Sequence, residues 1–344
     1  MHHAERDDYD ATLTCRPRLQ NILQQIAAGR KSQIPNPKSQ IPKPKVSVVV
    51  TTYNSEAFIA PCLESLARLD DDPLEIIVVD NASTDATIER AQATGRYDVL
   101  IPNETNRGCG GGNNDGWRAA SGDVVVFLTP DTTVDPGLVR ALEDAFALHP
   151  RAVVCGCKIL YPDGQTLWHA GGLVHPNGMP THRGYGEADR GQYDELCRID
   201  YVSGCALAFQ RAFLEAVGGF NEDYWPGYFE ETDLCFRARR MGYDVLYVPR
   251  AVVFHHESQS FKLHSPAFFH YMYRNRIRFL INNYTLHDWL TRFLPFEYQW
   301  MRRIPEARGF RRRQLRYYAA GLAYGLRKLI RYPFAAKPTG IRSS

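Results

Sequence analysis

Short apolar runs alternate along the chain with segments in which apolar residues recur at helical spacing. Val46–Thr52 and Val124–Leu128 are apolar runs of strand length, rich in valine, as is typical of strands that are buried on both faces. The alternation predicts an α/β fold, a mostly parallel sheet flanked by helices that binds ligands at the carboxyl ends of its strands. The further elements predicted up to residue 150 are strands over 75–79 and 99–101 and helices over 56–69, 84–93, 113–120 and 136–148.

The pattern becomes less regular after residue 150. A strand is expected over 153–160, strand-like residues follow at 201–209, and a helix begins near Phe229. Between them, the stretch from Trp168 to Gly191 is rich in glycine, histidine and proline, and it is long for a loop without a function. We therefore expect this irregular loop to line or cover a substrate site.

Composition narrows the class of protein. With 344 residues, 44% of them hydrophobic and 23% charged, the chain can bury a substantial core, which excludes disordered, collagen-like and disulfide-stapled small proteins. Its eight cysteines form no CxxC pair, so we expect most of them to be buried thiols rather than zinc ligands. The sequence contains no run of eighteen apolar residues and no apolar signal-peptide core near its N-terminus, which predicts a cytoplasmic location.

Charge divides the chain into three parts. Residues 1–45 contain the repeat KSQIPNP and KSQIPKP, which predicts a flexible leader rich in proline and lysine. Residues 46–261 hold 31 acidic and 16 basic residues, whereas residues 262–344 hold 17 basic and 3 acidic ones. The basic tail mixes arginines with aromatic residues, which favours a helical extension that contacts an anionic membrane surface over a nucleic-acid site. A solvated helix face or a dimer contact is the alternative interpretation.

Polar residues follow the first two predicted strands, where a parallel sheet offers its ligand crevice. A carboxylate there can accept hydrogen bonds from the ring N–H of uracil or thymine or from ribose hydroxyls, so we expect Asp80 to contact a ligand. For Ser83, Thr84 and Asp85, capping of the next helix is the competing interpretation, and for Asp85 we prefer it. The polar residues at these two strand ends are Thr52, Tyr53, Asn54, Asp80, Asn81, Ser83, Thr84 and Asp85.

A glycine-rich turn precedes the helix expected over 113–120. It runs from Asn106 to Asn114 with the sequence NRGCGGGNN. Backbone N–H groups at such a helix start can face a phosphate. The turn does not fit the dinucleotide fingerprint GxGxxG, because Asn113 stands where the third glycine is required. The competing interpretation is a tight turn that needs glycine for a positive φ.

Two residues downstream could hold a cation. Asp131 follows the strand over 124–128, and an acidic domain needs a divalent cation to hold a diphosphate, so Asp131 is a candidate ligand of Mg²⁺ or Mn²⁺. A simple turn carboxylate is the alternative. His255 follows a later strand and is a candidate contact to the ion or the diphosphate, although a lone histidine is more often structural.

The helix that begins near residue 230 carries three acids in its first turn. Carboxylates in that position are stabilised by the helix dipole, which is the structural explanation. Aromatic neighbours would also desolvate a carboxylate and raise its pKa toward the value useful for a general base. Asp233 and Arg237 are four residues apart and are expected to pair, which leaves Glu230 and Glu231 for catalysis.

With these motifs assembled, residues 46–261 resemble family 2 glycosyltransferases, particularly the rhamnosyltransferase-like bacterial branch. A weaker likeness extends to YRNRIRFL at 273–280. Each motif alone is modestly specific, and six in family order are highly specific. The motifs are VSVVVTTYNS, EIIVVDNASTD, NRGCGGGNNDGWRAA, FLTPDTTVDPG, YFEETDLCFRARRMGY and VVFHHESQS.

The resemblance implies a GT-A fold, with a nucleotide-sugar half over 46–135 and an acceptor half over 136–261. It implies metal-assisted, inverting transfer from a UDP- or dTDP-sugar to a hydroxyl of a glycan or lipid-linked acceptor in cell-surface polysaccharide or glycolipid synthesis, at the inner membrane face. By motif position, Asp80 contacts the base, Asp131 the metal, and Glu231 deprotonates the acceptor. The residues expected to contact the nucleotide sugar are Thr52, Tyr53, Asn54, Glu56, Asp80, Asn81, Ser83, Asn106, Arg107, Gly108, Asn113, Pro130 and Asp131.

The chain departs from the family pattern at two places. Many relatives carry Asp-x-Asp where Thr129-Pro130-Asp131 has one acid, which leaves the need for a metal open. Many carry Glu-Asp where this chain has Glu230-Glu231, which leaves the choice of base between the two glutamates open. A catalytically decayed nucleotide-sugar binding module and a peripheral membrane scaffold are therefore competing functions.

Overall fold

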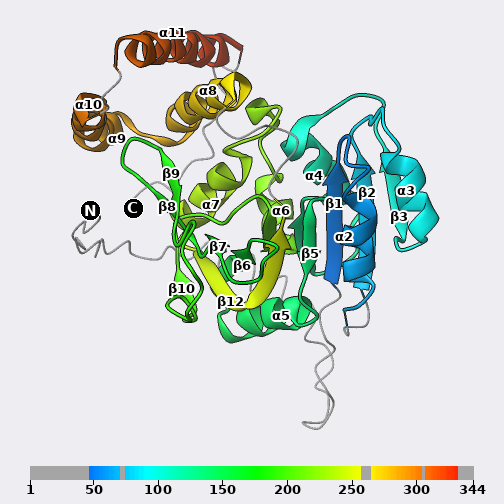
Figure 1. Cartoon of the computed structure of the whole chain (residues 1–344). Helices are drawn as coiled ribbons and strands as arrows, with labels where there is room; N and C mark the ends of the chain where they lie inside the picture. Colours follow the sequence, from blue (N-terminus) through cyan, green and yellow to red (C-terminus); the bar gives the residue numbers. More distant parts are fainter. Residues whose placement is uncertain (1–45, 70–73, 257–264, 304–306, 332–344) are drawn as a thin grey trace, which may run out of the picture. The chain divides into compact units, whose positions relative to one another are not determined.

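The computed structural model describes residues 46–69, 74–256, 265–303 and 307–331 (Figure 1). The predicted leader, Cys15 and the last residues of the basic tail lie outside the described residues. The described strands are β1 Val46–Thr52, β2 Leu74–Asp80, β3 Val99–Pro102, β4 Val124–Leu128, β5 Thr132–Val134, β6 Ala152–Leu160, β7 Leu167–His169, β8 Gly172–Val174, β9 Pro180–His182, β10 Cys197–Arg198, β11 Ala206–Gln210 and β12 Asp244–His255.

Helices connect and follow these strands. Two short non-α turns, η1 Glu222–Tyr224 and the π-helical η2 Trp289–Phe293, lie among them. The described α-helices are α2 Ile59–Leu66, α3 Thr87–Thr94, α4 Gly108–Ala119, α5 Leu138–Leu148, α6 Arg211–Val217, α7 Glu230–Arg240, α8 Pro266–Asn283, α9 Leu286–Asp288, α10 Leu294–Arg303 and α11 Ala307–Arg331.

One large mixed sheet carries the fold, with the strand order β10-β12-β6-β11-β4-β1-β2-β3. The pairs β4–β1, β1–β2, β2–β3 and β12–β6 are parallel, and β11 is antiparallel to both of its neighbours, β4 and β6. The antiparallel β11 therefore joins the parallel strands of the first half to those of the second. The predicted α/β class with a mostly parallel sheet is confirmed.

Helices cover both faces of this sheet, as Figure 1 shows. On one face, α2 and α5 pack on alternate residues of β1 and β4 such as Val48 and Val126. On the other face, α4, α6 and α7 pack on the intervening residues such as Val49 and Phe127. Because both faces are buried, the strands read as continuous apolar runs rather than alternating ones, which explains why β1 and β4 match their predicted bounds.

Helix α4 begins at Gly108, five residues before the predicted start, and the glycine-rich turn is largely helix. Gly108 has a φ of 72°, as the tight-turn interpretation predicts. The later glycines serve a different purpose, because an added Cβ would lie 2.4 Å from Thr51 at Gly112 and 2.2 Å from Val49 at Gly116. Glycine lowers helix propensity, so the sequence pattern hid a helix that close packing on β1 stabilises.

Strand β11 begins at residue 206, five residues later than the strand-like run suggests. Ser203 forms a turn there, since its hydroxyl accepts a hydrogen bond from the backbone N–H of Cys205 (3.2 Å) and its carbonyl accepts one from that of Ala206 (3.3 Å). This turn lies beside the carboxyl end of β4, because the Thr129 N–H donates to the Cys205 carbonyl (3.0 Å). The delayed strand start therefore leaves an irregular turn at the edge of the sheet where ligands are expected.

The basic tail is helical, as predicted, and a buried ion pair links its helices. Arg276 on α8 is fully buried and bonds both carboxylate oxygens of Glu297 on α10, at 3.0 and 2.9 Å. Asn177, between β8 and β9, and Tyr318 on α11 also donate to Glu297. A buried pair of this kind is costly to break from one side, which makes it a specific tie between these elements. Within the described residues, no helix combines the length and apolar character required to cross a membrane.

We expect the close packing of α4 on β1 to contribute to the free energy of unfolding. Replacing Gly116→Ala forces the new methyl group into Val49, so the free energy of unfolding should fall by roughly 1–3 kcal/mol despite the better helix propensity of alanine. Gly110→Ala is the matched control in the same helix, because its Cβ would meet no atom closer than 3.6 Å. Chemical denaturation measures both, and equal stability of the two variants would contradict the packing argument.

Candidate active site

The carboxyl ends of β1 and β2 lie side by side and present the expected donor residues. Thr52 is in register with Asp80, and both are almost fully buried. The carboxylate of Asp80 accepts hydrogen bonds from the Ser83 N–H (2.9 Å) and hydroxyl (2.5 Å), which fixes its orientation at the strand end. The Thr52 hydroxyl is buried without a hydrogen-bond partner in the described structure. Both side chains therefore lie at the strand ends where the sequence predicts ligand contacts.

A reciprocal set of bonds joins the two loops that follow these strands. Asn54 has a φ of 48°, its N–H donates to Ser83 Oγ (2.9 Å), and its Oδ1 accepts from the Thr84 N–H (2.8 Å). Glu56 accepts from Ala86, and its own N–H donates to Asp85 Oδ2 at 3.1 Å. Tyr53, directly before Asn54, is 41% exposed. The loop geometry thus occupies Asn54 and Glu56 and leaves the Tyr53 ring accessible.

The carboxylate of Asp85 bonds the start of α3. Its Oδ1 accepts from the N–H (3.0 Å) and hydroxyl (2.5 Å) of Thr87, the first residue of the helix. Burial opposes ionisation, but these hydrogen bonds lower the pKa of Asp85 below its usual value. The contacts match the capping interpretation preferred from the sequence.

The glycine-rich start of α4 is tied to the strand ends by side chains. Asn81 donates to the Gly108 carbonyl (3.0 Å), and Asn113 accepts from the Thr51 hydroxyl (2.7 Å). Asn106 accepts from the Gly108 N–H, and its carbonyl accepts from the indole of Trp225 (3.1 Å). These expected ligand contacts are thus engaged within the chain and hold the turn in place.

Arg107 is likewise committed to the protein. Its guanidinium pairs with Asp115 (2.6 Å) on α4 and with Glu222 (3.0 Å) in η1. Glu222 also accepts from Asn114 (2.9 Å), so η1 is fastened to α4. The hydrogen bonds and charges of its partners raise the pKa of Arg107 further, against a smaller desolvation effect. Arg107 therefore joins α4, in the first half of the fold, to η1, in the second half.

Strand β12 brings His255 to Asp131. It pairs antiparallel with β5, and this register places His255 opposite Thr132, the residue after Asp131. His255 Nε2 lies 3.3 Å from Asp131 Oδ2, and the His256 N–H donates to the Asp131 carbonyl (2.9 Å). Asp131 follows Pro130 directly at the carboxyl end of β4. The two residues proposed from the sequence as neighbours are thus adjacent, although 124 positions separate them.

The pair is charged and incompletely satisfied. Burial alone would raise the pKa of Asp131, but the hydrogen bond and charge of His255 bring it below its usual value. Burial lowers the pKa of His255, yet Cys205 and Asp131 outweigh it and raise that pKa to about 10. Asp131 Oδ1 and His255 Nδ1 are buried without hydrogen-bond partners in the described structure. In that part of the chain, no group of three or more His, Cys, Asp or Glu side chains is arranged as a metal cluster.

The irregular segment after β6 packs against His255, although the sequence did not show which of its residues would make this contact. Trp168 packs edge-on against His255, with ring centroids 4.7 Å apart, and equally close against His182. His182 and His169 lie Nδ1 to Nδ1 at 2.8 Å, and burial lowers the pKa of His182 to about 4, so it is neutral at pH 7. The glycine, histidine and tryptophan content marked this segment, but only the fold shows that Trp168 contacts the Asp131–His255 pair.

The two glutamates at the start of α7 occupy different environments. Glu230 is 7% exposed, and its Oε2 has no hydrogen-bond partner in the described structure. Glu231 is partly exposed and accepts from the Thr232 hydroxyl (3.0 Å). Its carboxyl group lies beside Gly204, where an added Cβ would be 3.8 Å away. Because Gly204 adjoins Cys205 at the end of β4, Glu231 faces the same edge of the sheet as Asp131.

Their protonation follows from these environments. Desolvation raises the pKa of Glu231, although hydrogen bonds from its backbone and Thr232 oppose the rise. Burial and then the charge of Glu231 raise the pKa of Glu230 well above its usual range. Glu231 therefore ionises first, and Glu230 keeps its proton beside it.

The glutamates lie between the start of α4 and the turn beside β4. An added Cβ at Gly227 would be 3.1 Å from Cys109 Sγ, at the start of α4, and 3.8 Å from Glu230 Oε1. Glu231 lies at Gly204, next to Cys205, whose carbonyl accepts from the Thr129 N–H. Both glutamates are therefore on the same edge of the sheet as Asp131.

A buried brace holds α7 in this position. Asp233 accepts from Arg237 (2.9 Å), as the four-residue spacing predicted, and also from Tyr224 (3.0 Å) and Asn283 (2.6 Å). On α8, the fully buried Asn275 donates to the carbonyls of Tyr224, Gly227 and Tyr228. The loop before Glu230 is thereby fixed from both sides. The sequence indicated the Asp233 pair but gave no sign of Asn275.

Comparison with known proteins identifies the fold. A solved structure of GalNAc-T7 with UDP, GalNAc and Mn²⁺ superposes with a TM-score of 0.59 over 95% of this chain and 68% of that one, at 13% identity. TarS 1-349 of S. aureus gives 0.52 over 82% and 80%, at 20% identity. These likenesses define the class by its fold, which is the GT-A fold of glycosyltransferases.

The family follows from sequence. The model of glycosyl transferase family 2 matches residues 47–218, which is half of the chain. The N-acetylglucosaminyl-diphospho-decaprenol L-rhamnosyltransferase of Mycobacterium tuberculosis is 31% identical over 235 residues, covering 62% of this chain and 76% of the relative. The chain belongs to glycosyl transferase family 2, as the resemblance of its motifs implied.

Proposed function

We propose that this glycosyltransferase moves a sugar, with inversion, from a UDP- or dTDP-sugar to a hydroxyl of a lipid-linked or glycan acceptor in cell-surface polysaccharide or glycolipid synthesis. The observation that carries the proposal is the pair Glu230–Glu231, of which Glu230 is buried and Glu231 partly exposed, at the same edge of the sheet as Asp131. The mycobacterial relative, whose name describes rhamnosyl transfer to a sugar carried on a decaprenyl diphosphate, supports the acceptor class. The ligands of GalNAc-T7 support the donor class.

The donor would lie along the ends of β1, β2 and β4. Asp80, held by Ser83, is suited to accept from the base or the ribose, and Thr52 offers an unpartnered hydroxyl beside it. Asp131 and His255 would then lie at the diphosphate, at the end of β4. Asn81, Asn106, Arg107 and Asn113 act by holding the turn of α4 in place, and Gly108 lets that turn pass close to the Trp225–Pro226 loop.

A divalent cation, Mg²⁺ or Mn²⁺, fits the donor set at this point. Asp131 has a carboxylate oxygen without a partner, and hard oxygen ligands suit both ions. His255 has an unpartnered Nδ1; in its protonated form it would contact the diphosphate, and it would bind the ion only after losing that proton. When bound, the cation would offset the negative charge that grows on the leaving diphosphate.

Glu231 is the proposed general base. Its ionised carboxylate takes the proton of the acceptor hydroxyl while that oxygen forms a bond to the anomeric carbon and the bond to the diphosphate oxygen breaks. A single displacement from the face opposite the leaving group inverts the anomeric centre. Glu230 stays protonated and adds no negative charge beside the nucleophile. The raised pKa of Glu231 makes it a stronger base than an exposed glutamate.

The single acid at the end of β4 is the observation that favours the second candidate, a decayed nucleotide-sugar binding module. Such a module would bind the donor through Asp80 and Asp131 without transferring the sugar. The environment of Glu230 argues against decay, because a buried acid with an unpartnered oxygen lowers the stability of a protein that has no use for it. A peripheral membrane scaffold is the third candidate, and it would need none of these acids.

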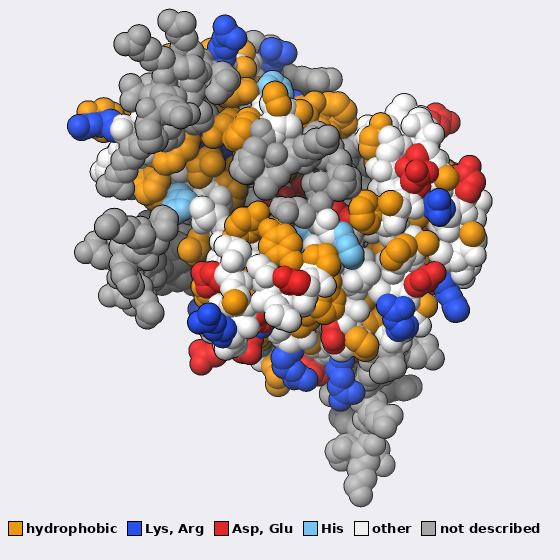
Figure 2. All heavy atoms as spheres, viewed as in Figure 1, with side chains coloured by type: hydrophobic (Ala, Val, Ile, Leu, Met, Phe, Trp, Pro, Cys, Tyr) orange, Lys and Arg blue, Asp and Glu red, His pale blue; other side chains and the backbone are white. Residues whose placement is uncertain are grey.

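We further propose that the enzyme works as a peripheral protein at an anionic membrane surface, on the cytoplasmic side. Leu286, Leu290, Leu294 and Tyr298 recur every four residues from α9 to α10, and each is more than half exposed. Figure 2 shows hydrophobic side chains gathered over the region of α8 to α10, near Lys and Arg side chains. An apolar helical stripe with basic neighbours is the usual form of an interfacial contact.

The leucine stripe generates a prediction. The triple variant Leu286→Gln, Leu290→Gln and Leu294→Gln should bind phosphatidylglycerol-containing vesicles at least about tenfold less, since each leucine contributes roughly 1.5–3 kcal/mol when buried. Leu148→Gln on α5 is the matched control, because its side chain is 75% exposed on an unrelated element. Vesicle co-sedimentation measures both, and undiminished binding of the triple variant would remove the stripe from the membrane contact.

The two glutamates generate the test of the function itself. Glu231→Gln should lower kcat by about 10²–10⁴-fold, the usual contribution of a general base, with UDP affinity retained. Glu230→Gln should be far milder and should leave the acid limb of the kcat/KM pH profile in place, because glutamine mimics the protonated neighbour. In the wild type, activity should rise with pH through the raised pKa of Glu231.

Product formation from a panel of UDP- and dTDP-sugars, with UDP binding measured in parallel, checks this prediction. Full activity of Glu231→Gln, or an equal loss in both variants, would overturn the assigned roles. Donor binding without any transfer in the wild type would favour the binding module.

A further inference from the structure

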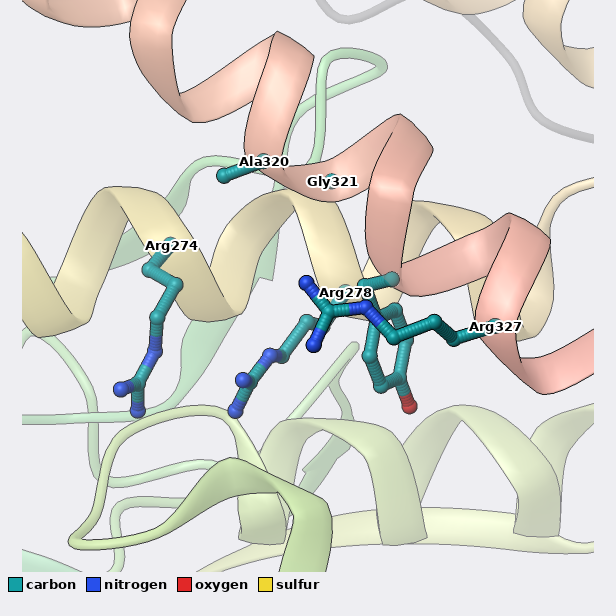
Figure 3. A pocket seen from close by; sticks show the side chains of 6 residues that line it. Arg274, Arg278, Ala320, Gly321 and Arg327 are labelled. Carbon is teal, nitrogen blue, oxygen red and sulfur yellow. The ribbon is translucent and has the colours of Figure 1, made fainter.

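A pocket lined by three arginines lies between α8 and α11, apart from the acid cluster. It has a volume of about 180 Å³ and is formed by Arg274, Arg278, Ala320, Gly321, Tyr324 and Arg327. Figure 3 shows Arg274 and Arg278 extending from α8 in the same direction and Arg327 reaching toward Arg278 from α11. We call it the α8–α11 pocket. Nothing in the proposed mechanism uses it.

The positive charge of this pocket is only partly offset by the protein, through the carboxylate of Asp223, which accepts a hydrogen bond from the lining Tyr324 (2.6 Å). Arg274 donates to the Trp225 carbonyl and Arg278 to the Asp223 carbonyl, which are neutral acceptors. In the described part of the chain, none of the three arginines forms an ion pair with a carboxylate. Burial and the charge of Arg278 lower the pKa of Arg274 to about 10. An anion in the pocket would relieve this repulsion, and arginines are well suited to bind phosphate oxygens.

The α8–α11 pocket adjoins the loop that leads to the glutamates. Arg274 holds the Trp225 carbonyl, and the neighbouring Asn275 holds three carbonyls of the same loop. Trp225 and Glu230 are five positions apart in the sequence, so their Cα atoms are at most about 17 Å apart. A group bound in the pocket would therefore contact Arg274, which holds the loop that leads to the proposed base.

Exposed apolar side chains also lie on the helices around the pocket. Leu322 and Leu326 on α11 are 68% and 60% exposed, and helical spacing places them on the face of α11 opposite the residues that line the pocket. The stripe of leucines from α9 to α10 belongs to the same helical region. With these side chains at a membrane surface, as proposed above, the phosphate groups near the pocket are those carried on lipids, which favours a phosphorylated lipid over a free anion.

From this geometry we infer that the α8–α11 pocket binds the diphosphate of a prenyl-diphosphate-linked acceptor, so that α8 joins acceptor binding to the placement of the catalytic loop. The inference rests on the proposed function for its acceptor. Phospholipid headgroups carry the same phosphate chemistry, and the experiment must separate the two sources.

Binding of geranyl diphosphate to the full chain, saturated with UDP to fill the donor site, tests the inference. Arg327→Gln should weaken this binding about tenfold, which corresponds to about 1.4 kcal/mol, because one charged contact to the diphosphate is lost. Arg316→Gln is the matched control, an exposed arginine on the same helix that does not line the pocket. Arg327 has an exposed side chain, so folding should be preserved, and thermal melting verifies this.

Each outcome decides a separate point. Equal affinity of wild type, Arg327→Gln and Arg316→Gln for geranyl diphosphate overturns the inference. A response of phosphatidylglycerol-vesicle binding alone assigns the pocket to phospholipid headgroups and also overturns it. UDP affinity, measured on the same samples, reports on the donor site, so its absence in the wild type would instead contradict the proposed function.

Discussion

The pairing of β12 with both β5 and β6 is the constraint on which the site depends. One stretch of β12 runs parallel to β6, and its last residues also pair antiparallel with β5, with a register shift between Val248 and Val252. This pairing carries His255 to Asp131, across 124 positions of sequence. Because β5 directly follows Asp131, the same hydrogen bonds that close the sheet also set the spacing of the two side chains.

The ligand edge concentrates acids, and the protein manages them by different means. Asp131 is stabilised as an anion by His255, whereas Glu230 is kept neutral by burial and by its ionised neighbour. Asp233 is buried too, but three donors satisfy it, and it serves as a brace for α7. Ionised and protonated carboxyl groups therefore lie side by side because their surroundings differ, which is the arrangement that separates binding from proton transfer.

Sequence patterns correctly predicted the features that depend on neighbouring residues in the chain. The strands at 46–52 and 124–128 were predicted to the residue because burial on both faces leaves an unbroken apolar run. The Asp233–Arg237 pair followed from helical spacing and is confirmed by a 2.9 Å contact. Most of the described cysteines are buried free thiols, as expected.

Other features depend on contacts between distant segments and left no local signal. The early start of α4 was missed, because glycines that disfavour a helix in isolation are required where α4 approaches Val49. Trp168 and Asn275 could not be assigned, since neither residue type nor spacing tells which loop it will contact. The roles of the site residues stay predictions, and they gain support from the contact of Asp131 with His255 and from the position of Glu231 at the same edge of the sheet.

The central claim is that the ends of β1, β2 and β4, together with β12, form one site for a nucleoside diphosphate. A crystal structure of the full chain with UDP and Mn²⁺ tests it most directly. The account predicts the uracil or ribose in hydrogen-bond contact with Asp80, the cation on Asp131, and the diphosphate beside His255. Diphosphate bound away from Asp131, or a nucleoside away from Asp80, would contradict it.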